Sequence, residues 1–246
     1  MIFSRLFHQY IRNQELDIPK DRSLWPQDWK QVDFKQYKRF PEILLPEPTV
    51  LSSTLEEALN ARTSSRVFDQ NTEFTLTELS TVLHYGFGIK VSVNGIRTST
   101  DEKLAQTRRY YPSGGARYPL EVYVFVHSVT DVDSGMYHYD VSNHSLRLIG
   151  DESLLQKITP LLHKNSQSPK VIMVLSAKQE RNAIKYKEHG YDMIGLECGH
   201  AAQNALLVAA ALAKKSYGFF GYDIKQLAEM MDLDDDELIF YALMFG

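Results

Sequence analysis

The segment Arg62-Thr-Ser-Ser-Arg places two arginines and three hydroxyl groups within five residues. Arginine presents rigid pairs of N–H donors that match the oxygens of a phosphate, and serine adds neutral donors. Because the segment follows the expected end of a helix, it can chelate a phosphate monoester. Taken alone, the same residues favour a solvated polar loop, so phosphate binding needs support from elsewhere in the chain.

A second segment, Tyr110-Tyr-Pro-Ser-Gly-Gly-Ala-Arg-Tyr-Pro, contains two adjacent glycines between prolines. Gly114 and Gly115 predict a tight turn before a strand, in which main-chain donors can approach a ligand closely. Turns of this kind often only join two elements, so this signal is also weak by itself. No G-x-G-x-x-G opens a β-α-β unit, and a Rossmann nicotinamide site is therefore not expected.

Lys185 and Tyr186 are adjacent in the polar segment Arg181-Asn-Ala-Ile-Lys-Tyr-Lys-Glu-His-Gly-Tyr. Partial desolvation would make the lysine a base of lowered pKa and the phenol a proton donor. On the residues alone, a charged linker before the next helix is the preferred interpretation.

A long alanine-rich helix is expected over residues 193–215, with Glu197 near its N-terminus, where the helix dipole favours negative charge. Gly199 and the alanines permit close approach of another helix. Cys198 and His200 fall on different helix faces, so a Cys–His nucleophile pair is not expected. His138 lies alone in an expected strand, where a packing or surface role is favoured. The histidines show no ligand spacing, and no metal is expected.

These residues must be positioned by an irregular succession of helices and strands, which predicts an α+β fold. Helices are expected from a capping pattern at Ser53 and over residues 75–85, 154–159, 193–215 and 224–231. Strands are expected over residues 120–126, 135–140, 144–149, 170–176 and 238–245. The polar stretch 91–108 is expected to be a flexible loop.

Residues 1–50 are expected to form an extended arm, and residues 51–246 the main domain. The arm contains both tryptophans, Trp25 and Trp29, and five of the nine prolines. Proline at this density ends helices and weakens strands. Because the aromatic side chains need burial, the arm is expected to wrap the body or a partner subunit.

The composition is that of a globular protein, with 43% hydrophobic residues and a formal net charge of −4. Such a balance gives no sign of nucleic-acid or anionic-membrane binding. The longest apolar-rich run, residues 205–213, is far shorter than the roughly 20 residues of a membrane span. A single cysteine excludes an intramolecular disulfide, and the N-terminal residues lack a signal-peptide pattern, so a cytoplasmic protein is expected.

Together, the segments resemble the nitroreductase-like flavoprotein superfamily, and more narrowly the azoline (SagB-type) dehydrogenases of ribosomal peptide biosynthesis. The resemblance covers nearly the whole chain. It rests on Arg62-Thr-Ser-Ser-Arg-Val-Phe, Tyr111-Pro-Ser-Gly-Gly-Ala-Arg-Tyr-Pro-Leu-Glu-Val-Tyr, Gly135-Met-Tyr-His-Tyr-Asp, Lys185-Tyr-Lys-Glu-His-Gly-Tyr with Glu197-Cys-Gly-His-Ala-Ala-Gln-Asn, and a looser Gly218-Phe-Phe-Gly-Tyr-Asp.

The resemblance implies a homodimer that binds FMN at the subunit interface, with the long helix at the dimer core. By position, Arg62, Ser64 and Arg66 would hold the phosphate and ribityl chain, Pro112, Ser113, Gly114, Gly115 and Ala116 would line the flavin, and Phe220 and Gly221 would approach flavin N5.

The implied reaction oxidises a peptide thiazoline or oxazoline to the aromatic azole, with molecular oxygen reoxidising the flavin. Lys185 and Tyr186 match the family's catalytic Lys-Tyr pair. They would act as base and as proton donor or positioner, with the two roles interchangeable. The implied partners are a modified precursor peptide and a cyclodehydratase.

Two other functions remain open. The first is an NAD(P)H-dependent nitro- or quinone reductase on the same scaffold, which would be reduced rapidly by NAD(P)H. The second is a scaffold subunit that holds a peptide-modifying synthetase complex together, for which the aromatic arm is the only support.

Overall fold

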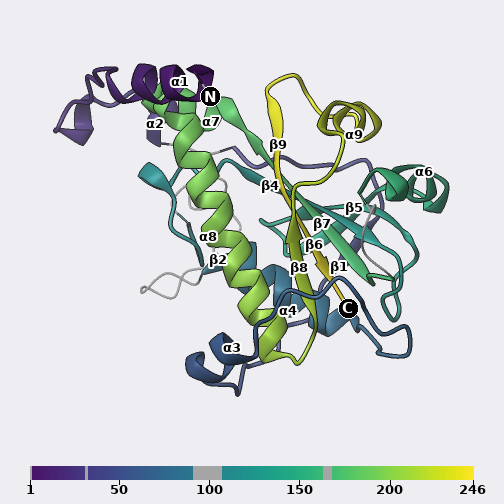
Figure 1. The fold of residues 1–246 in the computed structure, drawn as a ribbon. Coiled ribbons are helices and arrows are strands. Elements are labelled where there is room, and N and C mark those ends of the chain that lie inside the picture. Colours follow the sequence, from purple (N-terminus) through teal and green to yellow (C-terminus); the bar gives the residue numbers. More distant parts are fainter. Residues whose placement is uncertain (1, 31–32, 91–106, 163–167) are drawn as a thin grey trace.

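The computed structural model describes residues 2–30, 33–90, 107–162 and 168–246, and it is built around a seven-stranded sheet (Figure 1). The strand order is β1-β6-β5-β4-β7-β9-β8, and every neighbouring pair in it is antiparallel. The two short strands β2 and β3 pair separately. Helices and an antiparallel sheet together confirm the α+β prediction.

The strands of the described residues are β1 (Glu42–Leu44), β2 (Ile89–Lys90), β3 (Arg108–Arg109), β4 (Leu120–Val126), β5 (Gly135–Asp140), β6 (Ser145–Gly150), β7 (Val171–Lys178), β8 (Ser216–Phe219) and β9 (Glu237–Phe245). The α-helices are α1 (Ile2–Arg12), α2 (Gln27–Lys30), α3 (Leu55–Ala61), α4 (Leu76–Phe87), α6 (Glu152–Leu162), α7 (Gln179–Tyr186), α8 (His189–Ala211) and α9 (Ile224–Met230). Short 3₁₀ turns occur at Arg22–Leu24 and Gly114–Ala116.

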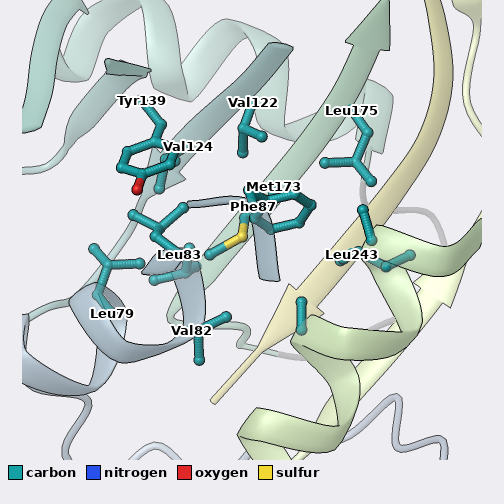
Figure 2. Close-up of a cluster of buried hydrophobic side chains, with 14 of the residues drawn as sticks. Leu79, Val82, Leu83, Phe87, Val122, Val124, Tyr139, Met173, Leu175 and Leu243 are labelled. Atoms are coloured by element: carbon teal, nitrogen blue, oxygen red, sulfur yellow. The ribbon is translucent and has the colours of Figure 1, made fainter. Parts of the chain in front are cut away.

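Helices cover both faces of the sheet, because its central strands carry apolar side chains on both sides. In β4, Val122 and Val124 point to the layer formed by α4 and α8. Tyr123 and Phe125 point to the opposite layer, formed by α6 and α9. Figure 2 shows apolar side chains of α4 against those of β4, β5, β7 and β9. The two cores fix the sheet and therefore the turns at its ends.

Helices α3 and α4 begin as the sequence predicts. Thr54 and Glu57 form a reciprocal capping box at the start of α3, and Thr75 and Glu78 do the same for α4. Strands β4, β5, β6, β7 and β9 and helices α6 and α9 also lie where the sequence places them.

Helix α8 begins at His189, four residues before the predicted start, and this changes the position of Glu197. The residue before the helix, Glu188, makes no side-chain cap. No capping pattern therefore marks the true start in the sequence. Glu197 lies inside the helix rather than in its first turn, so the prediction that it benefits from the helix dipole is wrong.

The segment before α8 is helical as well. Residues 179–186 form α7, and only residues 187 and 188 separate it from α8. The charged-linker interpretation of the Lys185 region is therefore wrong. Lys185 and Tyr186 occupy the last turn of a helix that packs against α8.

The N-terminal arm is not extended throughout. Residues 2–12 form α1, in which Ile11 is buried and Phe7 makes an edge contact with Tyr191 of α8. Apolar residues four positions apart share one helix face, and this spacing outweighed the charges between them. Farther along, β1 adds a strand to the edge of the main sheet beside β6. The arm thus wraps the body, as predicted.

Two further differences concern short elements. Strand β8 was not predicted, because Gly218 interrupts its pattern. Most of the predicted loop, residues 91–106, lies outside the described residues, while Arg108 and Arg109 form β3. In the described part of the chain, no helix combines the length and apolar character of a membrane span.

Candidate active site

Helix α7 is fixed to the sheet by Arg181, one turn before Lys185. The Arg181 guanidinium lies 2.6 Å from the Glu121 carboxylate on β4 and donates to the carbonyl of Tyr118 at 3.2 Å. His138 Nε2 lies 2.8 Å from the same carboxylate. Burial raises the pKa of Glu121, but Arg181 and His138 outweigh burial and lower it to about 2. Glu121 is therefore a permanent anion that anchors α7 to the sheet.

His138 has a more specific role than packing. It is completely buried, and it completes this ion-pair cluster of Glu121, Arg181 and His138 from β5. The strand alternation that predicts its burial does not reveal a partner 17 positions away on the neighbouring strand.

Lys185 is covered by the N-terminal arm. Its side chain is buried, with Nζ 3.5 Å from the centre of the Trp25 ring and 5.8 Å from that of Trp29. The Trp29 indole donates to the carbonyl of Ile184 at 3.0 Å, and Arg117 donates to the carbonyl of Trp29 at 3.0 Å. Aromatic faces stabilise a nearby ammonium, so the arm supplies a surface that favours positive charge on Lys185.

Gly115 brings the glycine turn, residues 112–116, against Lys185 and Tyr186. A Cβ at Gly115 would lie 2.2 Å from the Tyr186 hydroxyl oxygen and 3.3 Å from Lys185 Nζ. The backbone of Gly115 is left-handed, with φ +62°, a conformation that glycine adopts without strain. Glycine is needed here both for its conformation and for this close approach.

Tyr186 is half-buried, and burial raises its pKa above the ordinary value of 10.0, with Arg117 opposing and Glu197 reinforcing this shift. Its hydroxyl therefore keeps its proton at neutral pH. The last turn of α7 thus presents one amine and one phenol to the same backbone turn.

Glu197 holds the other side of the glycine turn. Its Oε1 accepts a hydrogen bond from the Gly114 N–H at 3.1 Å. Burial raises the pKa of Glu197 to about 7, against the lowering effects of Ser113, Gly114, Asn182 and Arg109. Glu197 consequently changes its protonation near neutral pH.

A cavity of about 600 Å³ opens beside the turn, a size typical of small-molecule sites. Four of the predicted flavin-lining residues contribute to its wall: Pro112, Ser113, Gly115 and Ala116. Its remaining wall is aromatic and basic, formed by Trp25, Lys90, Arg108, Arg109, Tyr110, Tyr111 and Tyr118. Gly114 faces Met193 and Glu197 instead.

The other predicted cofactor residues gather along β8. Ser64 forms a bridge with Ser216, Arg62 donates to Ser64 at 3.5 Å, and Arg66 lies 4.9 Å from the centre of the Tyr217 ring. Phe220 is exposed, and a Cβ at Gly221 would meet nothing within 4 Å. Arg62, Ser64, Arg66, Phe220 and Gly221 form what we call the β8 group.

Different elements hold the two sets of predicted cofactor residues, which are the β8 group and the glycine turn. Arg62, Ser64 and Arg66 of the β8 group follow α3, and Phe220 and Gly221 follow β8, whereas the glycine turn lies against α7 and the first half of α8. Helices α3 and α7 lie at opposite ends of α8 (Figure 1). In the described residues, no group of three or more His, Cys, Asp or Glu side chains could hold a metal ion.

The nitroreductase family model matches residues 59–246. The chain belongs to the nitroreductase family. It is therefore an oxidoreductase, and the family match includes the glycine turn, Lys185 and Tyr186, α8 and the β8 group.

The proteins similar to this chain include a nitroreductase and a peptide-processing protein. The nitroreductase MJ1384 of Methanocaldococcus jannaschii is 30% identical over 201 residues, which cover 80% of this chain and 93% of that protein. The microcin B17-processing protein McbC of Escherichia coli is 31% identical over 134 residues, 52% of this chain and 49% of McbC. The aligned part thus spans about half the length of McbC.

A solved structure extends the similarity in fold to the whole chain. The Escherichia coli microcin synthetase McbBCD complex, with truncated pro-MccB17 bound, matches with a TM-score of 0.60 at 22% identity. The match covers 100% of this chain and 92% of that one. The arm and the body therefore both have structural counterparts in that chain.

Three residues of the site were missed or misjudged from the sequence. Trp25 was assigned to an aromatic arm, Glu197 to a helix terminus, and Asn182 to a linker. Asn182 precedes Lys185 by one helix turn and is fully buried beside Glu197. A helical reading of residues 179–186 would have placed Asn182 and Lys185 on one face.

Proposed function

We propose that this oxidoreductase is an FMN-dependent dehydrogenase that oxidises peptide thiazolines or oxazolines to thiazoles or oxazoles. The observation that carries the proposal is that Lys185 Nζ and the Tyr186 hydroxyl lie against Gly115, a residue that lines the 600 Å³ cavity. Proton removal from a ring requires a base and an orienting donor within reach of one atom, and this geometry supplies both.

The residues present suit FMN. Arg62 and Arg66 provide donors for a phosphate, and the exposed Phe220–Gly221 backbone leaves room for a flat ring. Pro112, Ser113, Gly115 and Ala116 would line the flavin from the cavity side. When bound, FMN supplies a two-electron acceptor that molecular oxygen can reoxidise.

Lys185 is assigned as the base and Tyr186 as the proton donor or positioner. As Lys185 accepts the ring proton, its positive charge develops against the Trp25 face, which stabilises it. Tyr186 keeps its proton, because burial raises its pKa, and it can therefore hold a ring heteroatom or carbonyl by donating. The buried Glu121–Arg181 ion pair fixes α7 to the sheet and so holds Lys185 and Tyr186 in place.

A homodimer would unite the two cofactor groups. A phosphate at the β8 group of one subunit and a ring at the glycine turn of its partner would form one site across α8. One face of α8 supports this arrangement. Leu196 is 63% exposed, and neither Gly195 nor Gly199 would place a Cβ within 4 Å of any atom. Small residues on an open helix face allow a second helix to approach closely.

The proposed partners are a modified precursor peptide and a cyclodehydratase. McbC processes microcin B17, and the McbBCD structure holds a truncated precursor. These relatives support a peptide substrate and work beside an enzyme that forms the rings.

The deciding experiment replaces Lys185 with Ala and follows azole formation from a heterocyclised peptide by mass spectrometry. We expect azole formation to fall by roughly 10²- to 10⁴-fold, the contribution of a general base, with FMN content unchanged. Lys170→Ala is the matched control, because Lys170 is another buried lysine, bonded to the carbonyl of Gln70. Full activity in Lys185→Ala would refute the catalytic assignment.

A nitro- or quinone reductase is the second candidate, favoured by the similarity to MJ1384 over 93% of that protein. Rapid flavin reduction by NADPH in stopped flow, together with no azole product, would support it. A colourless protein that does not take up added FMN would exclude both enzymes and support a scaffold subunit.

A further inference from the structure

Glu197 is a buried carboxyl that the proposed proton transfer does not use. It is 3% exposed and lies inside α8, where its Oε1 accepts from the Gly114 N–H. Oε2 makes no well-aligned hydrogen bond among the described residues, although the Ser113 and Asn182 side chains lie close to the carboxyl. A buried carboxylate oxygen without a partner is costly, so its retention calls for an explanation.

Asn182 lies beside this carboxyl and is also fully buried. Neither its amide oxygen nor its amide nitrogen makes a well-aligned hydrogen bond within the described part of the chain. A Cβ at Gly190 would lie 2.9 Å from the Asn182 Cβ, so α7 and α8 meet closely at this point. Glu197 and Asn182 therefore form a polar pocket behind the glycine turn, between the two helices.

The glycine turn is strained and needs an anchor. Gly115, Ala116 and Tyr118 all have positive φ, which costs energy in residues other than glycine. Ser113 accepts from the Tyr118 N–H at 2.9 Å and secures one end of the turn. The Gly114 N–H secures the other end, through Glu197.

We infer that Glu197 is a positioning residue, which holds Gly114 so that Gly115 stays packed against Lys185 and Tyr186. This role rests on the proposed function, because it matters for catalysis only if that pair transfers the proton. The ionised carboxylate is the stronger acceptor for an N–H group, so the turn is held more tightly when Glu197 is charged.

The charged and titratable groups around Glu197 come from three sides. Arg109 of β3 favours its ionised form, whereas Tyr111, Tyr186 and Cys198 become harder to ionise in its presence. Burial thus opposes the ionisation of Glu197, whereas Arg109 and the hydrogen bond from the glycine turn favour it. The anchor should tighten as the pH rises through about 7.

The test compares Glu197→Gln and Glu197→Ala with the wild-type protein by NMR hydrogen exchange of the Gly114 amide. For local openings that break this bond while Glu197 stays buried, the wild-type protection factor should rise between about pH 6 and pH 8, although ionisation lowers the stability of the whole fold. Gln retains an acceptor without a titrating group, so its protection should not vary with pH. In Glu197→Ala we expect protection to fall by roughly 10- to 100-fold, the range for a bond to a charged acceptor.

The catalytic readout uses the same variants. We expect kcat in Glu197→Ala to fall by roughly 10- to 100-fold with KM nearly unchanged, because the pair is misplaced by a fraction of an ångström. Glu197→Gln should lose the pH dependence of kcat near pH 7. The control is Glu237→Gln, which alters a buried carboxylate bonded to Lys35, Tyr123 and Ser176 rather than to the glycine turn, and should keep the wild-type pH profile.

Unchanged Gly114 protection in Glu197→Ala, or a wild-type pH profile in Glu197→Gln, would overturn the inference. If Glu197→Ala does not fold, the Gln variant decides alone. The exchange measurement needs neither substrate nor activity, so failure of the proposed reaction would leave its result intact.

Discussion

Two buried glutamates occupy opposite electrostatic environments. Glu121 on β4 is 5% exposed and Glu197 on α8 is 3% exposed. Glu121 lies 2.6 Å from Arg181 and 2.8 Å from His138, whereas Glu197 accepts a hydrogen bond from the backbone N–H of Gly114. The pKa of Glu121 is lowered to about 2 and that of Glu197 is raised to about 7.

The difference shows that burial alone does not decide the charge of a carboxyl group. Burial raises both pKa values, and only the fully paired group overcomes it. Glu121 belongs to the framework that carries α7 and keeps its charge across the physiological range. Glu197 holds the glycine turn through the Gly114 N–H and changes its charge within that range.

Removing the charge of Glu121 should have the largest effect on stability. Glu121→Gln leaves the Arg181 guanidinium buried without its anion, which costs about 3–5 kcal/mol. Because the folded pKa of about 2 lies below the ordinary 4.5, the stabilisation is present above pH 4.5 and is lost as the pH falls towards 2. In urea unfolding, the difference in unfolding free energy between the wild type and Glu121→Gln should therefore be large at pH 7 and smaller at lower pH. An equal difference at both pH values would contradict the ion-pair assignment.

Removing the charge of Glu197 should act in the opposite direction. Its folded pKa of about 7 lies above the ordinary 4.5, so the folded protein binds the extra proton and loses stability as the pH rises through 7. Glu197→Gln should therefore gain about 1–3 kcal/mol over the wild type on going from pH 5 to pH 8. Thermal unfolding of both proteins between pH 5 and pH 8 measures this gain. A difference in stability that does not vary with pH would show that Glu197 does not titrate in this range.

The basic side chains of the two regions differ in the same way, with a smaller expected effect. Arg181 is paired with a carboxylate, whereas Lys185 lies against the Trp25 ring. A double-mutant cycle of Trp25→Leu and Lys185→Met should give a coupling energy of about 1–2 kcal/mol, as expected for a desolvated cation–π contact. Urea unfolding of the four proteins measures it. Additive effects would mean that the arm covers Lys185 without stabilising its charge.

Most regular elements could be predicted from the sequence because their local patterns are strong. Strand β4 is apolar throughout, and α4 carries a reciprocal cap with periodic leucines. Helix α8 was begun too late because its true start has no capping side chain. Strand β8 was missed because it is held by pairing with β9 rather than by its own residues.

The same distinction between local sequence patterns and long-range contacts applies to the residues of the site. Lys185, Tyr186 and the glycine turn could be proposed because each lies in a short contiguous motif. The role of Glu197 depends on Gly114, 83 positions earlier in the chain, and no local pattern reports that contact. Trp25 reaches Lys185 from the opposite end of the sequence. Long-range contacts decide which charged groups are buried with partners, and so decide their pKa values.

The arm also affects how the molecule behaves among copies of itself. Both outer strands of the main sheet are short, with three residues in β1 and four in β8. Strand β6, which β1 covers, has six. A chain trimmed to residues 59–246 would present the bare edge of β6 as a row of unpaired N–H and C=O groups, a template on which other chains aggregate. The three residues of β1 cover half of this edge, and we expect them to reduce aggregation.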